Sequence, residues 1–296
     1  MFFPYLNYNE PLFRPPSEAY SLIIQVSLGC SWNKCAFCEM YTSKKFKVRN
    51  EEDIFNEISS VAEFSADIKK VFLADGNAMV LSTEKLLRIL THLNEKFPKL
   101  TRVSAYAIAK DMENKSVEEL KELYDAGLKL IYVGIESGDD ELLGLINKGE
   151  TYESTVKNLL KAKEAGIKSS AMILNGLGGK KYSVQHAVNS ARVVNEIQPD
   201  YLSTLVLSFP FGVEHFIKRF KGDFQQMDIA DLLKELKLFI SETKLNNVIF
   251  RSDHASNYLV LKGILSRDKE RMLKEINFAI DNPGKAFLRE EEQRRL

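Results

Sequence analysis

The cysteines of this chain all fall in one short stretch, Gly29-Cys30-Ser31-Trp32-Asn33-Lys34-Cys35-Ala36-Phe37-Cys38, and no other cysteine occurs in the 296 residues. Three thiols this close together are typical of a metal centre. An iron–sulfur cubane normally takes one thiolate per iron, so three cysteines leave one iron of a four-iron cluster without a protein ligand. An open iron indicates a catalyst rather than an electron carrier.

Other interpretations of the three cysteines compete with an iron–sulfur site. Passive packing of cysteine as a small apolar residue does not explain why all three occur in one loop. A disulfide leaves one thiol over, and prolines and acids interrupt the N-terminal sequence, which does not resemble a secretory signal. Structural zinc takes four ligands, so His186, His215 or His254 would have to complete the set from elsewhere in the chain.

The composition argues against two classes of partner. The 41 basic residues balance 41 acidic ones, so the chain lacks the strongly positive field that nucleic acid backbones select. No apolar run approaches the roughly 20 residues that span a bilayer. With 45% hydrophobic and 28% charged residues, the sequence is typical of an ordinary globular protein, which we expect in the cytoplasm.

Short apolar runs alternate with amphipathic segments from about residue 20 to about residue 207. Apolar residues recurring every three to four positions predict helices, whereas the apolar runs predict strands. Gly127 and Gly166 each end a helical segment, in the left-handed conformation that glycine allows. The predicted strands are 21–26, 70–73, 101–107, 128–134, 168–174 and 201–207, and the helices between them are 52–64, 83–96, 116–126, 152–165 and 184–197.

This alternation predicts a parallel sheet with right-handed crossovers. Six strand–helix units are too few for an eight-fold barrel, so we expect an α/β fold, a partial (β/α)6 parallel barrel with a small C-terminal α+β extension. The functional edge of such a sheet is the carboxyl end of its strands. We assign 1–19 to an extended N-terminal arm, 20–208 to the barrel, and 209–296 to a mainly helical subdomain covering the barrel mouth.

The C-terminal third departs from the regular alternation. Residues 228–243 predict an amphipathic helix, and a short apolar strand follows at 247–250. We expect the mostly polar residues after this strand to form a loop that folds back over the barrel mouth. Within it we select Arg251, His254 and Asn257 as candidate catalytic or substrate-binding residues. A lone histidine in a loop is more often a structural hydrogen-bonding partner, which is the competing interpretation of His254.

The cysteine stretch resembles the cluster loop of the radical S-adenosylmethionine (radical SAM) superfamily. It follows an apolar strand directly, and the aromatic Phe37 stands immediately before the last cysteine. The spacing departs from the usual pattern, since four residues rather than three separate Cys30 from Cys35. The resemblance covers about residues 20 to 207. Within the superfamily, the chain resembles the branch that contains the tRNA methylthiotransferases and the oxygen-independent coproporphyrinogen dehydrogenases.

The resemblance implies cofactor-binding residues after the second and third predicted strands. Asp75, Gly76 and Asn77 stand where the family holds the amino group of the methionine part, although the family's usual Gly-Gly-Glu is absent. Ser104 and Tyr106 occupy alternate positions of a strand and so point to one side. They resemble a polar pair near the cofactor in that branch, and serve equally well as hydroxyls of the core. Phe37, beside the last cysteine, belongs to the same implied set.

Residues 133–149 closely resemble the corresponding stretch of the same branch. The resemblance implies that Glu136 and Ser137 lie beside S-adenosylmethionine and that Lys148 pairs with its carboxylate. These residue types suit the task, because a carboxylate accepts hydrogen bonds from a ribose or an ammonium and a lysine supplies a point charge. The competing interpretation is a helix start, since Ser137 and Asp139 are both good N-cap residues.

The fifth predicted strand leads into a glycine-containing turn that resembles the family's adenine site. Asn175 and Gly176 are the residues implied to contact the cofactor there. The pattern is only partly kept, since Lys180 or Lys181 stands where the family has an acid. A glycine-rich turn between strand and helix also binds phosphates or simply reverses the chain, so this match is less specific than the others.

The resemblance also implies the chemistry. A [4Fe-4S] cluster on Cys30, Cys35 and Cys38 would bind S-adenosylmethionine, and a reductant such as flavodoxin or ferredoxin would supply the electron that cleaves it under anaerobic conditions. The products are methionine and a 5'-deoxyadenosyl radical, which removes hydrogen from a small-molecule or other substrate that we leave unassigned. Three cysteines leave none for an auxiliary cluster or a cysteine methyl carrier. A non-catalytic zinc or iron–sulfur module is the alternative function.

Overall fold

The computed structural model describes residues 6–294, which divide into two compact units. Unit 1 contains the described residues up to Asn33, together with Cys38–Val133 and Lys157–Ser169. Unit 2 contains Lys34–Phe37, Gly134–Val156 and the described residues from Ser170 onward. The division passes through the cysteine stretch, so that Cys30 and Cys38 belong to unit 1 and Cys35 belongs to unit 2.

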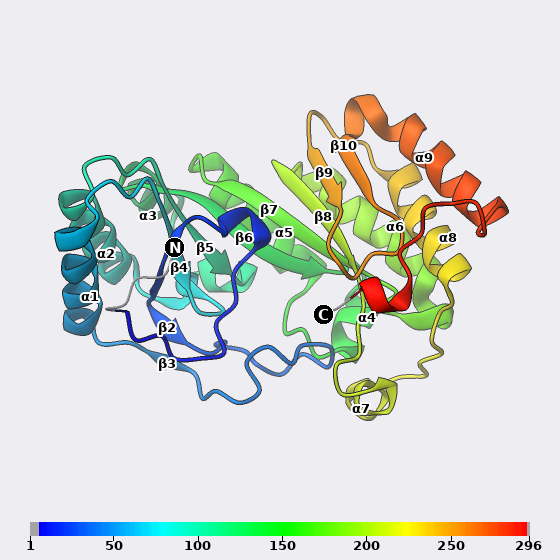
Figure 1. The fold of residues 1–296 in the computed structure, drawn as a ribbon, viewed down its shortest axis with the longest axis horizontal. Coiled ribbons are helices and arrows are strands. Elements are labelled where there is room, and N and C mark those ends of the chain that lie inside the picture. The colour runs from blue at the N-terminus through cyan, green and yellow to red at the C-terminus, as the bar shows by residue number, and fades with distance from the viewer. Residues whose placement is uncertain (1–5, 295–296) are drawn as a thin grey trace. The chain divides into compact units, whose positions relative to one another are not determined.

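The strands of unit 1 are parallel and hydrogen-bonded side by side, as the alternating pattern predicts. A separate two-stranded antiparallel pair joins the chain before and after the cysteine stretch, at β2 (Ser27–Leu28) and β3 (Lys47–Val48). The parallel strands, in spatial order, are β1 (Leu22–Gln25), β4 (Lys70–Ala74), β5 (Arg102–Ala107) and β6 (Leu128–Glu136), of which β6 enters unit 2 at Gly134. The helices between them, shown in Figure 1, are α1 (Glu51–Phe64), α2 (Thr83–Lys96) and α3 (Val117–Asp125). A 3-10 turn, η1 (Pro16–Glu18), precedes β1, and two others, η2 (Ala78–Val80) and η3 (Ala109–Met112), follow β4 and β5.

The strands of unit 2 continue the parallel arrangement and end in one antiparallel strand. They are β7 (Lys168–Asn175), β8 (Tyr201–Val206) and β9 (Ile249–Ser252), all parallel, followed by β10 (Leu261–Ile264), which runs antiparallel to β9. Helix α5 (Tyr152–Glu164) begins in unit 2 and passes into unit 1 at Lys157. The other elements of unit 2 are α4 (Asp140–Leu145), α6 (Gly179–Ile197), α7 (Val213–Arg219), α8 (Ile229–Glu242), α9 (Leu265–Asp281) and η4 (Glu291–Gln293). Helix α8 packs between α6 and α9 (Figure 1).

The parallel α/β fold and all six predicted strands are confirmed. Helix α6 begins at Gly179, five residues before the predicted start at 184. The predicted start was late because paired glycines are typical of a turn, whereas here Gly179 is already the first residue of the helix. Strand β9 extends to Ser252, so the prediction that Arg251 lies in the polar loop is wrong. Among the elements that were not predicted, helices α4 and α7 are too short to show a helical period, and Gly263 breaks the apolar pattern in the sequence of β10.

Local sequence signals explain where several helices begin and end. Five helices start at an N-cap whose side chain accepts a hydrogen bond from the first turn, which satisfies a backbone N–H that has no helical partner. Gly127 (φ +115°) and Gly166 (φ +89°) have the positive φ expected after α3 and α5. No helix in the described part of the chain is both long and apolar enough to cross a membrane. The N-cap residues are Asn50, Ser82, Ser116, Asp139 and Asp228.

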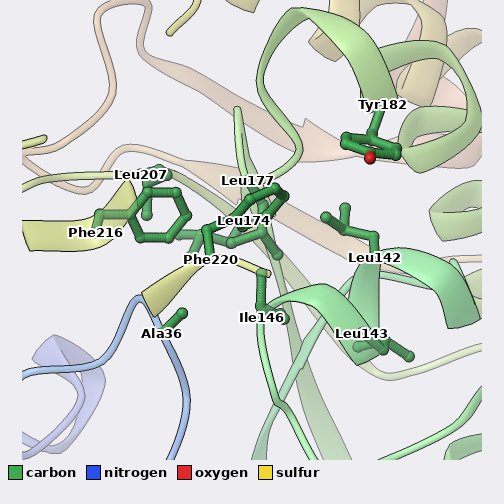
Figure 2. Packing of buried hydrophobic residues seen from close by; sticks show 10 residues of the cluster. All are labelled: Ala36, Leu142, Leu143, Ile146, Leu174, Leu177, Tyr182, Leu207, Phe216 and Phe220. Carbon is green, nitrogen blue, oxygen red and sulfur yellow. The ribbon is translucent and has the colours of Figure 1, made fainter. Parts of the chain in front are cut away.

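A hydrophobic cluster in unit 2 holds one residue of the cysteine stretch. Ala36 lies between Cys35 and Phe37, is 1% exposed, and packs with residues of α4, β7 and α7 (Figure 2). Its backbone N–H donates to the carbonyl of Ile146 (2.8 Å). Residues 34–37 are therefore anchored by the core itself. The cluster consists of Ala36, Leu142, Leu143, Ile146, Leu174, Leu177, Tyr182, Leu207, Phe216 and Phe220.

Shortening Leu142 tests this core. Its side chain is fully buried, so Leu142→Ala removes apolar contacts and leaves a cavity, and we expect a loss of about 2–5 kcal/mol in the free energy of unfolding. Leu160→Ala is the matched control, because Leu160 is 39% exposed on α5. Urea denaturation monitored by circular dichroism measures both. Equal losses in the two variants would contradict the assignment of Leu142 to the core.

Candidate functional site

All three cysteines are half-buried and none forms a disulfide. Within residues 6–294 no group of three or more His, Cys, Asp or Glu side chains is already gathered as a metal site. The three-thiolate centre stays a prediction, and its support comes from the contacts that hold the cysteine stretch.

Asp75 holds the cysteine stretch of unit 1 from both sides. Its Oδ2 accepts hydrogen bonds from the backbone N–H of Gly29 (3.0 Å), just before Cys30, and from Lys44 Nζ (2.8 Å), a few residues after Cys38. Asp75 is fully buried and the Lys44 side chain is 5% exposed. Removing one partner of such a pair leaves an uncompensated buried charge, which is strongly destabilising. Asp75 Oδ1 makes no hydrogen bond among the described residues.

Asn77 fixes the start of the same stretch. Its Nδ2 donates to Ser31 Oγ (2.8 Å) and to Asp111 Oδ2, while its Oδ1 accepts from the backbone N–H of Ile108 (3.2 Å). The side chain is buried and all its polar atoms are engaged. The sequence placed Asn77 beside S-adenosylmethionine, and in the structure its side chain holds the cysteine stretch.

Gly76 lies where no side chain fits. A Cβ on this residue would stand 2.8 Å from Tyr41 Cε2, closer than real Cβ contacts allow, and 3.0 Å from Cys30 Cβ, tighter than most of them. The backbone of the Asp75–Asn77 turn therefore runs directly against Cys30. Nearby, Trp32 is covered by Lys110, whose Nζ lies 3.9 Å from the indole centroid.

Ser104 and Tyr106 lie inside unit 1. The Tyr106 ring meets Phe72 edge-on at 5.0 Å and Tyr132 at 6.3 Å between centroids, and Ser104 Oγ donates to the carbonyl of Val71 (3.4 Å). Burial raises the pKa of Tyr106, with the neighbouring Tyr132 adding to the effect, so the phenol keeps its proton. Both side chains make core contacts, and their cofactor role stays a prediction.

Glu136, Lys148 and Phe37 come together in unit 2. Lys148 Nζ lies 3.4 Å from Glu136 Oε1 and 5.9 Å from the centroid of the Phe37 ring. Glu136 is 4% exposed, and its Oε2 has no hydrogen-bond partner in the described chain. Burial raises the pKa of Glu136, and Lys148 opposes that rise. A half-buried cation beside a buried carboxylate with an unfilled oxygen suits a ligand that carries both a carboxylate and hydrogen-bond donors.

A buried histidine connects Ser137 to the turn after β7. His186 Nε2 donates to the carbonyl of Leu174 (3.2 Å), so Nδ1 accepts from the Ser137 hydroxyl (2.8 Å). The same Nε2 is 3.8 Å from Glu235 Oε1, and that oxygen accepts a hydrogen bond from the backbone N–H of Gly176 (2.6 Å). Burial raises the pKa of Glu235, while His186 and the Gly176 N–H oppose the rise.

This chain of contacts shapes the predicted adenine turn. Asn175 Nδ2 donates to the carbonyl of Leu232 (3.2 Å), so helix α8 holds both Asn175 and Gly176. The sequence analysis missed Glu235 and assigned His186 only to a zinc alternative. The sequence held one signal, because Glu235 interrupts the apolar positions of α8. In the structure it is 3% exposed.

A cavity of about 290 Å³ in unit 2 borders this turn at Gly176. Its other walls follow β8 and include Phe209, Phe224 and Met227. Tyr258, Glu291 and Arg294 form a polar end. There Arg294 pairs with Glu291 (2.7 Å), and its guanidinium carbon lies 3.8 Å from the centroid of the Tyr258 ring. The complete lining is Gly176, Val206, Leu207, Ser208, Phe209, Pro210, Phe224, Gln226, Met227, Leu232, Tyr258, Glu291 and Arg294.

The three candidate substrate residues differ in their surroundings. Arg251 is on β9 with its side chain 63% exposed and lies 3.4 Å from Asp253. His254 Nδ1 accepts from the backbone N–H of Ser256 (3.2 Å), and burial lowers its pKa, so the imidazole is neutral near pH 7. Asn257 is buried and donates to a carbonyl of β8, that of Thr204 (2.8 Å).

The sequence missed what holds this loop. The Arg289 guanidinium donates to the carbonyls of Asp253 (3.2 Å), His254 and Asn257 (3.2 Å). Arg289 belongs to the charged C-terminal segment, where one arginine among many charges gives no signal. The loop also supplies Tyr258 to the cavity lining, so His254 and Asn257 belong to the segment that borders the cavity.

A family model described as the Radical SAM superfamily matches residues 24–193, more than half of the chain. Heme chaperone HemW of Bacillus subtilis is 24% identical over 164 residues, which is 55% of this chain and 42% of that protein. A tRNA-2-methylthio-N(6)-dimethylallyladenosine synthase of Thermodesulfovibrio yellowstonii is 27% identical over 169 residues, 54% of this chain and 36% of that protein. The chain thus spans less than half the length of either relative.

Solved structures share the fold. Coproporphyrinogen III oxidase (HemN) from Escherichia coli aligns with a TM-score of 0.56 at 18% identity, over 75% of this chain and 52% of that one. The methyltransferase TsrM from Kitasatospora setae aligns with a TM-score of 0.53 at 21% identity, over 66% of this chain and 39% of that one. At these identities the similarity is evidence for the fold alone, and it supports the predicted partial barrel.

Replacing Glu235 by glutamine tests the buried carboxyl. Because burial raises its pKa, the folded protein binds this proton more tightly than the unfolded chain, and stability falls as the pH rises from the unfolded pKa through the folded one. Glu235→Gln keeps an oxygen for the Gly176 N–H without the charge. We expect a higher thermal midpoint than wild type at about pH 7, and a difference that shrinks toward zero below about pH 4.

Thermal unfolding of both proteins across this pH range measures the effect. Glu242→Gln is the control, because Glu242 is exposed on the same helix. A difference between Glu235→Gln and wild type that does not change with pH would contradict a buried, titrating carboxyl.

Proposed function

This chain belongs to the radical SAM superfamily, and from that membership we propose that it is an enzyme that cleaves S-adenosylmethionine reductively on a [4Fe-4S] cluster. The observation that carries the proposal is the confinement of all three cysteines to one stretch whose neighbouring residues are anchored by buried contacts. Asp75 and Asn77 anchor the stretch in unit 1. In unit 2 the carbonyl of Cys35 accepts from Arg219 (2.7 Å).

The donor set fits such a cluster. Cys30, Cys35 and Cys38 supply three thiols, none of them in a disulfide, and three thiolates leave one iron for the cofactor. When bound, the cluster supplies the single electron that breaks a carbon–sulfur bond of the sulfonium. The task of the protein is to hold the cofactor in position and to tune the cluster. A reductant such as flavodoxin or ferredoxin is the proposed electron donor.

We assign the amino acid part of S-adenosylmethionine to the Glu136–Lys148 pair. Lys148 offers a positive charge to the ligand carboxylate, and the unpartnered Glu136 Oε2 accepts a hydrogen bond from a ribose hydroxyl or the ammonium. Glu136 is buried and the Lys148 side chain is only 11% exposed, so each interaction is stronger than it would be in water. We assign the adenosyl part to the turn at Asn175 and Gly176, which His186 and Glu235 hold in place.

The substrate is proposed to approach through the cavity beside Gly176. Its apolar walls and polar end favour a small molecule with both an apolar body and a polar group. His254 and Asn257 lie on the loop that also provides Tyr258 to this cavity, and we retain both as substrate-binding candidates. Arg251 is exposed beside Asp253, and a role for it would require a substrate reaching that surface.

The first test is anaerobic reconstitution with iron and sulfide. We expect brown protein with about four iron atoms per chain, which forms 5'-deoxyadenosine from S-adenosylmethionine only when a reductant is present. Cys30→Ser, Cys35→Ser and Cys38→Ser should each abolish 5'-deoxyadenosine formation, because a thiolate ligand is lost. Thr42→Ser is the control, an exposed change close to the last cysteine.

Two outcomes separate the alternatives. Colourless protein that retains zinc would assign the cysteines to a structural zinc site. Brown protein that never forms 5'-deoxyadenosine would leave a non-catalytic iron–sulfur module. That alternative has some support, because one relative carries the name of a heme chaperone rather than of an enzyme.

His254→Ala tests the substrate loop once metabolite screening has identified a substrate. We expect loss of substrate turnover while reductive formation of 5'-deoxyadenosine continues, because the imidazole belongs to the loop at the cavity and not to the predicted cofactor contacts. His215→Ala, at an exposed position of α7, is the control. Unchanged turnover in His254→Ala would remove His254 from the site.

A further inference from the structure

Tyr41, three residues after Cys38, carries a buried hydroxyl with no partner. The residue is 3% exposed, and its hydroxyl makes no hydrogen bond within the described chain. Buried polar groups are nearly always hydrogen-bonded, and an unpaired hydroxyl costs free energy. This orphaned hydroxyl therefore calls for an acceptor.

The Tyr41 ring is held against the cysteine stretch. The position that a Cβ of Gly76 would occupy lies 2.8 Å from Tyr41 Cε2 and 3.0 Å from Cys30 Cβ. Phe13 packs edge-on against the ring at 5.4 Å, and the backbone carbonyl of Tyr41 accepts from Asn33 Nδ2 (2.8 Å). Tyr41 Cε2, the ring atom next to the carbon that bears the hydroxyl, and Cys30 Cβ therefore lie close to the same point beside Gly76.

The hydroxyl is a donor under all ordinary conditions. A tyrosine hydroxyl ordinarily loses its proton only near pH 10, so at neutral pH it offers a hydrogen-bond donor. The acceptor of this hydrogen bond must lie beside the buried ring. Within unit 1 we consider two acceptors: Asp75 Oδ1, which has no partner in the described chain, or a sulfur of the cluster that Cys30 and Cys38 would help to hold.

We propose that the Tyr41 hydroxyl donates a hydrogen bond to a sulfur of the cluster held by the cysteines and so raises the reduction potential of that cluster. The inference rests on the proposed function, because it requires the cluster. Reduction adds negative charge to the iron–sulfur core, and hydrogen bonds to its sulfurs are one of the factors that set the potential. Asp75 already accepts from Gly29 and Lys44 through Oδ2, so its charge is balanced without Tyr41.

Tyr41→Phe tests the inference, because it keeps the ring against Gly76 and Phe13 and removes only the hydroxyl. Anaerobic redox titration of the reconstituted protein, followed by electron paramagnetic resonance, measures the potential. We expect the variant to be harder to reduce by about tenfold in the equilibrium constant, which is about 59 mV for one electron. Tyr20→Phe, at a 96% exposed position, should leave the potential unchanged.

A second measurement examines the bond directly. In wild type, exchange into heavy water should shift the iron–sulfur stretching bands in the resonance Raman spectrum, and in Tyr41→Phe that shift should shrink. A reduction potential and a Raman shift in Tyr41→Phe equal to those of wild type would overturn the inference. If the thermal midpoint of the variant were also lower, the hydroxyl would be assigned to Asp75 instead. Wild type that assembles no cluster would overturn the proposed function as well, whereas an intact cluster confines the failure to Tyr41.

Discussion

The buried ion pair between Asp75 and Lys44 is the constraint on which the cysteine stretch of unit 1 depends. One carboxylate oxygen binds the chain before Cys30 and the ammonium that follows Cys38, at distances of 3.0 and 2.8 Å. An irregular loop has no backbone ladder of its own, so side-chain contacts must define its shape. With both charges almost completely buried, the pair has no solvent to replace a missing partner.

Unit 2 uses the same principle with different residues. His186 and Glu235 lie between helices and strand ends, and together they fix the Ser137 hydroxyl and the Gly176 backbone. Neither side chain is more than 3% exposed. A polar network of this kind specifies one arrangement of a turn, because every alternative leaves a buried group unsatisfied.

The sequence was sufficient for the fold. Period and apolar runs located all six parallel strands, and Gly127 and Gly166 marked helix ends correctly. The roles of single polar residues were harder to predict, because they depend on partners distant in sequence. Asp75, which resembles a cofactor contact by position, pairs with Lys44, 31 residues away in the chain. Arg289 gave no pattern at all and holds a loop more than thirty residues upstream.

The only tryptophan of the chain stands between the first two cysteines, under the ammonium of Lys110. Indole emission responds to the charge above its face and is quenched by energy transfer to coloured metal centres. Trp32 is consequently a built-in optical reporter of this stretch, free of background from other indoles. Filling and emptying of the thiol site can be followed in real time by fluorescence, without attaching a label.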